Sequence, residues 1–228
     1  MSSVASRLIE RVCAAVGWKP KKFMKPDKII VGLGNPGARY RDTRHNVGFM
    51  TIDDLVARFA LGAPRSQFHA ESWDLRYQDQ NILLLKPSTF MNLSGTAVAE
   101  AVRFYKLDPS EALFVVCDDL DLPVAKLRLR ESAGSGGQKG LKDIAAKLGT
   151  QNFPRVRIGI GRPSASNDVV DFVLTTFRSD ERAEIDVAIK NAADSALLWA
   201  TNGMQAAMNK YNVSDKAGKE SGKKKRDE

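Results

Sequence analysis

Short apolar runs alternate with segments of helical periodicity along residues 28–213. Residues 28–33 (KIIVGL) form an apolar run that ends near glycine, as buried strands do, whereas residues 47–59 carry apolar side chains at helical spacing. The same reasoning predicts further strands over 71–77, 81–85, 112–117, 125–129, 156–160 and 169–174, and helices over 95–105, 137–148 and 180–200. Strands that alternate with helices predict a single α/β domain with a mixed, largely parallel sheet and helices on both faces.

The two ends of the chain lack this alternation. Residues 1–23 fit a short amphipathic helix followed by a Lys-Pro-Lys-Lys break, and charged residues interrupt the apolar positions too often for a secretory signal. Residues 214–228 are almost entirely polar, which predicts a disordered tail. We therefore predict a basic N-terminal extension over 1–27, partly helical or disordered, a folded domain over 28–213 and a basic tail over 214–228.

The composition is that of a globular protein. The 228 residues are 43% hydrophobic and 27% charged, enough to build one sizeable core. No apolar run reaches the roughly 18 residues of a membrane-spanning helix. The two cysteines, Cys13 and Cys117, are too few for a disulfide framework, and the two histidines, His45 and His69, for a clustered zinc site. We predict no metal, cofactor or membrane contact, and a reducing, cytoplasm-like compartment; organelle targeting by residues 1–23 is the alternative.

Basic charge is concentrated in a few stretches of the chain. The net charge is +8, of which residues 1–27 carry +4 and residues 214–228 carry +2. Residues 126–157 hold eight Lys or Arg side chains against two acidic ones, a local charge of +6, while the rest of the core is at −4. Such a stretch favours a defined anionic partner. A solvated helix face with flanking lysines explains the same charges without a partner.

Polar side chains follow three of the predicted strands. Asn35 and His45 follow the first strand, Asn92 follows the strand over 81–85, and Asp118 follows the strand over 112–117. Ligands of such sheets bind beyond the carboxyl ends of the strands. A histidine near a strand-end carboxylate can act as a general base, and the two asparagine amides can donate to a carbonyl oxygen that gains charge. Because Cys117 lies inside a strand and no serine occupies a nucleophile elbow, water is the expected nucleophile.

Each of these residues also has a purely structural explanation. Asn35 stands in an Asn-Pro-Gly turn formula, His45 can form a hydrogen bond at a helix start, and Asn92 can support the turn before Ser94. Asp118 can cap the loop before the next proline. The glycine-rich stretch over 134–140 matches neither the phosphate loop nor the dinucleotide fingerprint.

Five motifs occur between about Lys28 and Tyr211, namely VGLGNPGARYRDTRHNVGF, LLKPSTFMNLSG, DDLDLP, GLKDI and VRIGIGRP. In sequence, order and spacing, they together resemble the motifs of the bacterial-type peptidyl-tRNA hydrolases. The resemblance implies a monomeric, metal-free α/β enzyme that hydrolyses the ester between a peptide and the 3′-terminal ribose of tRNA. Its partner is then peptidyl-tRNA, shed by stalled ribosomes.

The resemblance also implies roles for individual residues. His45 is the expected general base, Asp118 orients it, and Asn35 contacts His45 or the nearby substrate. Substrate contacts are expected from Tyr40 near the terminal nucleotides and from Met91 and Asn92 at the peptide or the 3′ end. Three arginines match the family's tRNA-facing positions, namely Arg128, Arg130 and Arg157. Of these, Arg128 and Arg130 are the predicted phosphate clamp.

One position pair departs from the family pattern. Gln138-Lys139 stands where the family usually has His-Asn. Lys139 can donate hydrogen bonds but cannot accept them, so we expect an altered substrate contact there, to a phosphate or to the ester carbonyl. This departure and the N-terminal extension keep a second hypothesis open, a non-catalytic RNA-binding relative of the intron-splicing type that uses the same basic face. An unrelated nucleotide-binding enzyme is disfavoured because the phosphate-loop signature is missing.

Overall fold

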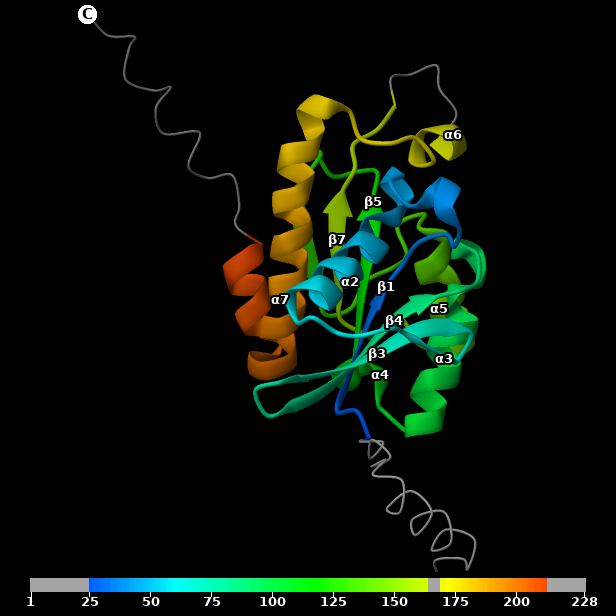
Figure 1. Cartoon of the computed structure of the whole chain (residues 1–228), viewed down its shortest axis with the longest axis vertical. Helices are drawn as coiled ribbons and strands as arrows, with labels where there is room; N and C mark the ends of the chain where they lie inside the picture. The colour runs from blue at the N-terminus through cyan, green and yellow to red at the C-terminus, as the bar shows by residue number, and fades with distance from the viewer. Residues whose placement is uncertain (1–24, 164–168, 213–228) are drawn as a thin grey trace, which may run out of the picture.

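The computed structural model describes residues 25–163 and 169–212, which form a seven-stranded sheet between helices (Figure 1). The sheet order is β2-β3-β4-β1-β5-β7-β6, and the four central strands β4, β1, β5 and β7 are mutually parallel, while the outer pairings are antiparallel. The strands are β1 (Lys28–Gly32), β2 (Arg65–Gln67), β3 (Ala70–Tyr77), β4 (Gln80–Pro87), β5 (Leu113–Asp119), β6 (Leu127–Arg130) and β7 (Arg155–Gly159). The predicted mixed α/β sheet is therefore confirmed, with its parallel part at the centre.

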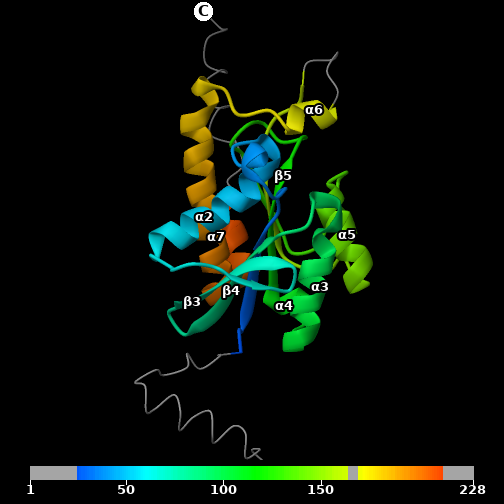
Figure 2. The same cartoon turned by 45° about the vertical axis from the view of Figure 1, so that its right-hand side comes forward.

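Helices cover both faces of the sheet, as predicted (Figure 2). On one face lie α2 (Val47–Arg58) and α7 (Ser179–Tyr211), and on the other lie α3 (Ser94–Tyr105) and α5 (Lys139–Leu148). Shorter helices are α4 (Pro109–Ala112) and α6 (Val169–Val173), together with three 3₁₀ turns over Ala38–Tyr40, Arg44–Asn46 and Met91–Leu93. Residues 1–24 of the predicted extension and the whole of the predicted tail over 214–228 lie outside the described residues.

The structure corrects the sequence prediction in two places: one predicted strand is a helix, and the last helix is longer than predicted. Residues 169–174, predicted as a strand, contain helix α6 instead, because an apolar run this short has no period that distinguishes a strand from a helix. Helix α7 runs to Tyr211, past a break at Gly203 (φ 82°, ψ 172°). The side-chain amide of Asn212 then bonds both the N–H and the carbonyl of Leu129, so it satisfies part of the free edge of β6.

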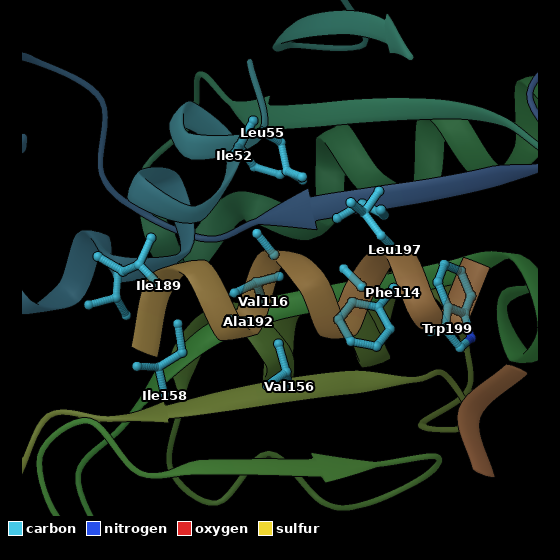
Figure 3. Close-up of a cluster of buried hydrophobic side chains, with 14 of the residues drawn as sticks. Ile52, Leu55, Phe114, Val116, Val156, Ile158, Ile189, Ala192, Leu197 and Trp199 are labelled. Carbon is cyan, nitrogen blue, oxygen red and sulfur yellow. The ribbon is translucent and has the colours of Figure 1, made fainter. Parts of the chain in front are cut away.

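Two apolar clusters fill the space on either side of the sheet. Alternate residues of β5 point to opposite faces, so Phe114 and Val116 join the α2/α7 side, whereas Val115 and Cys117 join the α3/α5 side. Figure 3 shows α7 lying over β5 and β7 in the first cluster, with Leu197 and other α7 side chains directed at the strands. Each fully buried side chain of this size contributes about 1.5–3 kcal/mol to folding, so the two clusters hold the sheet rigidly.

Helix α2 begins in direct contact with the backbone of the sheet. A Cβ atom on Gly48 would lie 2.4 Å from the Leu33 nitrogen and 2.5 Å from the Val116 oxygen. A Cβ on Gly32 would in turn lie 2.1 Å from the Gly48 oxygen. Glycine is required at both positions because the obstacles are main-chain atoms, which cannot rotate away as side chains do.

We expect Gly48→Ala to lower the free energy of unfolding by about 2–3 kcal/mol, because the added methyl group pushes α2 off the sheet. Urea unfolding followed by circular dichroism measures this change. Gly62→Ala is the matched control, since a Cβ there meets no atom within 4 Å. Equal unfolding midpoints for the two variants would contradict the close-packing argument.

Candidate active site

His45 and Asp118 meet beyond the carboxyl ends of β1 and β5. His45 lies in the turn before α2, Asp118 lies near the end of β5, and His45 Nδ1 is 2.8 Å from Asp118 Oδ2. Because an ionised carboxylate only accepts, Nδ1 carries the proton and Nε2 keeps its lone pair. Asp118 is buried while His45 is partly exposed. The pair therefore presents an oriented basic nitrogen.

Gln138 holds the other oxygen of Asp118. It is the N-cap residue of α5, where its Oε1 accepts a hydrogen bond from the Leu141 N–H at 2.8 Å. Its Nε2 donates to Asp118 Oδ1 at 3.1 Å and lies 3.0 Å from Met91 Sδ. Reasoning from sequence placed the substrate contact at Lys139 and missed this contact of Gln138. The available signal was a side chain with both donor and acceptor at the start of a helix.

A network of amides fixes Asn35. The Asn46 side chain accepts from the Asn35 N–H at 2.8 Å and donates to the Asn35 carbonyl at 3.0 Å. Asn35 Oδ1 in turn accepts from the Met91 N–H at 2.8 Å. With Oδ1 engaged, the Nδ2 amide is the polar group that Asn35 can offer to a ligand. Asn46, which is fully buried, was not singled out in the sequence, although it adjoins His45.

A cavity of about 550 Å³ opens over these groups, within the usual range for ligand sites. The polar wall of the cavity is the set of polar lining side chains that includes Asn35, His45, Asn92 and Lys139. The apolar wall is the set of apolar lining side chains, namely Phe90, Leu120, Val169, Val170, Val173 and Leu174. Met91 also lines the cavity. Tyr40 is not part of this lining, but its ring packs edge-on against that of Phe90, with centroids 6.5 Å apart.

Arg44 ties the turn that carries His45 to the segment that carries the apolar wall. Its buried guanidinium donates to the Ile160 carbonyl at 3.0 Å and to Glu181 Oε2 at 2.5 Å. The guanidinium also lies over the rings of Phe172 and Phe177, 4.6 and 4.8 Å from their centroids. Desolvation opposes ionisation of Glu181, but the hydrogen bond from Arg44 and one from a backbone N–H outweigh it and lower the pKa of this carboxyl group.

Two of the four arginines on β6 and β7 face solvent. Strand pairing sets Arg128 opposite Arg157 and Arg130 opposite Arg155. Arg128 and Arg130 are exposed, as a phosphate clamp requires. Arg157 is buried, donating to Asp119 Oδ2 at 3.1 Å and to the Gly134 carbonyl at 2.6 Å. Arg157 thus supports the glycine-rich loop beside exposed Arg128, and its own guanidinium is engaged by Asp119 and Gly134.

Arg155, which the sequence analysis did not single out, supports the same loop. It is 1% exposed and donates to the carbonyls of Ala133, Gln151 and Phe153. Burial lowers the pKa of its guanidinium to about 10. Its spacing of two residues from Arg157 on one strand was the signal that could have revealed it, because such residues share a face.

Three further findings concern the Cys117 thiol, metal binding and membrane-spanning helices. Burial raises the pKa of the Cys117 thiol to about 12, so this group stays protonated near neutral pH. Within residues 25–163 and 169–212, no three His, Cys, Asp or Glu side chains are grouped to hold a metal ion. In the same residues, no helix has the length and apolar character needed to cross a membrane.

The sheet with its parallel centre and the carboxylate-oriented histidine at its carboxyl edge define an α/β enzyme class whose site is suited to general-base chemistry. Residues 29–221 match the family model of peptidyl-tRNA hydrolase. The chain is 46% identical to the peptidyl-tRNA hydrolase of Brevibacillus brevis over 185 residues, which cover 81% of this chain and 97% of that protein. The peptidyl-tRNA hydrolase of Rhodopirellula baltica is 46% identical over 186 residues, covering 82% of this chain and 97% of that one.

The three-dimensional comparison agrees. The crystal structure of peptidyl-tRNA hydrolase from Acinetobacter baumannii matches with a TM-score of 0.77 and 36% identity, over 84% of this chain and 97% of the other. The chain belongs to the peptidyl-tRNA hydrolase family.

Glu181→Gln tests the anchor between Arg44 and α7. We expect a loss of about 1–2 kcal/mol in the free energy of unfolding at pH 7, because a charged hydrogen bond becomes a neutral one. Since the folded state lowers the pKa of Glu181, this contribution is present above the ordinary carboxyl pKa and is lost as pH falls through the lowered value.

Urea unfolding at pH 7 and at successively lower pH values measures this difference. Glu184→Gln, at an exposed position one turn further along α7, is the matched control and should change stability little. A difference between wild type and Glu181→Gln that stays constant down to acid pH would contradict the ionic role of Glu181.

Proposed function

We propose that this protein hydrolyses the ester bond between peptide and tRNA in peptidyl-tRNA, using a water molecule activated by His45. The observation that carries the assignment of roles is the 2.8 Å contact between His45 Nδ1 and Asp118 at the cavity. Membership of the family supports the reaction, since the similar proteins are named peptidyl-tRNA hydrolases.

The proposed reaction uses His45 first as a base and then as an acid. Nε2 takes a proton from water, and the water oxygen attacks the carbonyl carbon of the ester. The negative charge of Asp118 stabilises the imidazolium formed at His45. The tetrahedral intermediate then expels the 3′-ribose oxygen, which receives the proton from His45. The products are a peptide with a free carboxyl group and a tRNA with a free hydroxyl group.

Amide groups stabilise the carbonyl oxygen as its charge grows. Asn35 Nδ2 is suited to this role, because its own Oδ1 is held by Met91 and the group needs no reorientation during the reaction. Asn92 and Lys139 line the same cavity and are proposed to bind the peptide backbone and the 3′ end. Tyr40, beside Phe90 at the rim, is proposed to contact the terminal nucleotides.

The apolar wall of the cavity is proposed to receive the peptide. Its side chains, from Phe90, Leu120 and helix α6, offer no hydrogen-bond donors that would demand a particular sequence. Exposed Arg128 and Arg130 are proposed to bind tRNA phosphates, for which arginine has suitable bidentate geometry. The family resemblance implies a monomer, and we propose that the protein acts as one in the cytoplasm.

The alternative of a non-catalytic, intron-splicing type of RNA-binding protein is not favoured. The family match and the similar proteins point to the hydrolase. The contacts of Asp118 with His45 and Gln138 do not support this alternative either. A protein that only binds RNA has no need of an oriented imidazole.

His45→Ala should lower kcat at least about 100-fold on an N-acetylated aminoacyl-tRNA, because the general base is lost. The dissociation constant for the same tRNA should change less than about twofold. His69→Ala is the matched control, since His69 lies at the exposed surface near Glu100. An inactive wild-type protein, or a His45→Ala variant with full activity, would refute the proposed mechanism.

Arg128→Ala and Arg130→Ala should each weaken tRNA binding. Each should also flatten the slope of log affinity against log salt concentration by about one unit, as expected for the loss of one phosphate contact. Fluorescence titrations at several salt concentrations measure this slope. Arg76→Ala removes an exposed arginine from β3 and serves as the control. An unchanged slope would exclude the arginine concerned from the phosphate clamp.

A further inference from the structure

We propose that Gln138 is a positioning residue for the hydrolysis: its side-chain amide holds Asp118, and through Asp118 it holds the imidazole of His45. This inference rests on the proposed roles of His45 and Asp118. It differs from the expectation drawn from the sequence, in which Lys139 made the critical contact of this residue pair. Lys139 is exposed and lines the cavity, whereas Gln138 touches the catalytic pair itself.

The orientation of the Gln138 amide follows from its partners. Leu141 contributes an N–H donor, so the atom of Gln138 that faces it at 2.8 Å must be the oxygen. The nitrogen then faces Asp118 Oδ1 at 3.1 Å, where a carboxylate needs a donor. The reversed amide would set two donors against each other at Leu141 and two acceptors against each other at Asp118. The start of helix α5 therefore determines which end of the side chain meets the catalytic carboxylate.

Asp118 is held at both of its oxygens. Oδ2 contacts His45 Nδ1, and Oδ1 accepts from Gln138 Nε2, while the whole residue is only 3% exposed. Rotation of the carboxylate would break both contacts and leave a buried charge without partners, which is strongly unfavourable. The amide of Gln138 thus fixes the plane of the carboxylate and the direction in which His45 presents Nε2.

The neutral charge of Gln138 is part of this role. A lysine or arginine at the same place would neutralise Asp118 and weaken its attraction for the imidazolium that forms during catalysis. The nearby cation, Arg157, is paired instead with Asp119, the next residue along β5. Gln138 consequently orients the carboxylate of Asp118, and the negative charge of that carboxylate stays available to the imidazolium of His45.

The surrounding backbone is shaped to admit this side chain. A Cβ atom on Gly140 would lie 2.8 Å from Met91 Sδ and 3.1 Å from Gln138 Oε1. Met91 is also bonded through its N–H to Asn35, so Gln138 packs against the residue that fixes the proposed carbonyl-binding amide. Contacts of one buried side chain thus reach both proposed parts of the catalytic machinery.

Three substitutions at this position separate orientation of Asp118 from capping of α5. Gln138→Ser keeps a good N-cap residue but is too short to reach Asp118. Gln138→Glu keeps the acceptor for Leu141 and replaces the donor by a second carboxylate. Gln138→His restores one acceptor and one donor, because a neutral imidazole has both. Gln80→Glu, at the opposite end of the sheet, is the control for the change of charge.

Turnover of N-acetylated aminoacyl-tRNA by these variants, with kcat and KM determined from pH 5 to 9, tests the proposal. We expect kcat of Gln138→Ser to fall roughly 10- to 100-fold, as for loss of a hydrogen bond to a charged group, with KM within about twofold. Gln138→His should recover most of kcat. In Gln138→Glu the added negative charge favours the imidazolium, so the acidic limb of kcat should move up by about one pH unit.

Three results would overturn the proposal. If Gln138→Ser and Gln138→Glu keep the wild-type kcat and pH profile while His45→Ala is inactive, Gln138 has no positioning role and the proposed function stands. If all three variants lose activity in proportion to lost thermal stability, with no change in pH profile and no recovery in Gln138→His, the role is structural. Full activity of His45→Ala would instead refute the proposed function and this inference with it.

Discussion

The direct contact between helix α2 and the sheet is the constraint on which the site depends. Gly48 leaves no room for a Cβ against Leu33 and Val116, so the first turn of α2 lies against the main chain of β1 and β5. His45 precedes Gly48 by three residues, and Asp118 follows Val116 by two. The two side chains therefore meet although 73 positions separate them in the chain. Backbone packing brings the two side chains within reach of each other, and the hydrogen bond between them then fixes their orientation.

The end of β5 separates two charges that need different partners. Asp118 and Asp119 are consecutive strand residues, so their side chains point to opposite faces. Asp119 meets the cation of Arg157, which also holds the carbonyl of Gly134 in the glycine-rich loop. Asp118 meets His45 and the neutral amide of Gln138. One aspartate thus stabilises the loop while the charge of the other is kept for the histidine.

Much of the fold and of the candidate site follows from local patterns in the sequence. The central strands and the long helices were predicted because their apolar residues repeat with the period of the element that they form. Asn35, His45 and Asp118 were predicted to meet because each follows a strand of a sheet with a parallel centre. The five-residue helix α6 was predicted as a strand, since an apolar run this short has no period that distinguishes the two.

The roles of Gln138 and Arg157 could not be predicted in the same way. Whether an arginine on a strand is buried depends on which loop covers that face, and the loop over Arg157 comes from residues more than 20 positions away. Gln138 reaches Asp118 only because α5 begins beside the end of β5. The order of residues along the chain does not show that Arg157 lies near Gly134 or that Gln138 lies near Asp118. Both contacts become visible only in the folded structure.

The two walls of the cavity are held in different ways, and this difference suits a substrate with a constant bond and a variable peptide. The polar wall is locked by buried hydrogen bonds that join Asn35, Met91, Gln138 and Asp118. The apolar wall includes α6, a helix of five residues that is attached to the His45 turn through Arg44. In the proposed reaction the polar side chains bind the ester, which is the same in every substrate. The apolar side chains, which impose no hydrogen-bond pattern, receive the peptide, which differs between substrates.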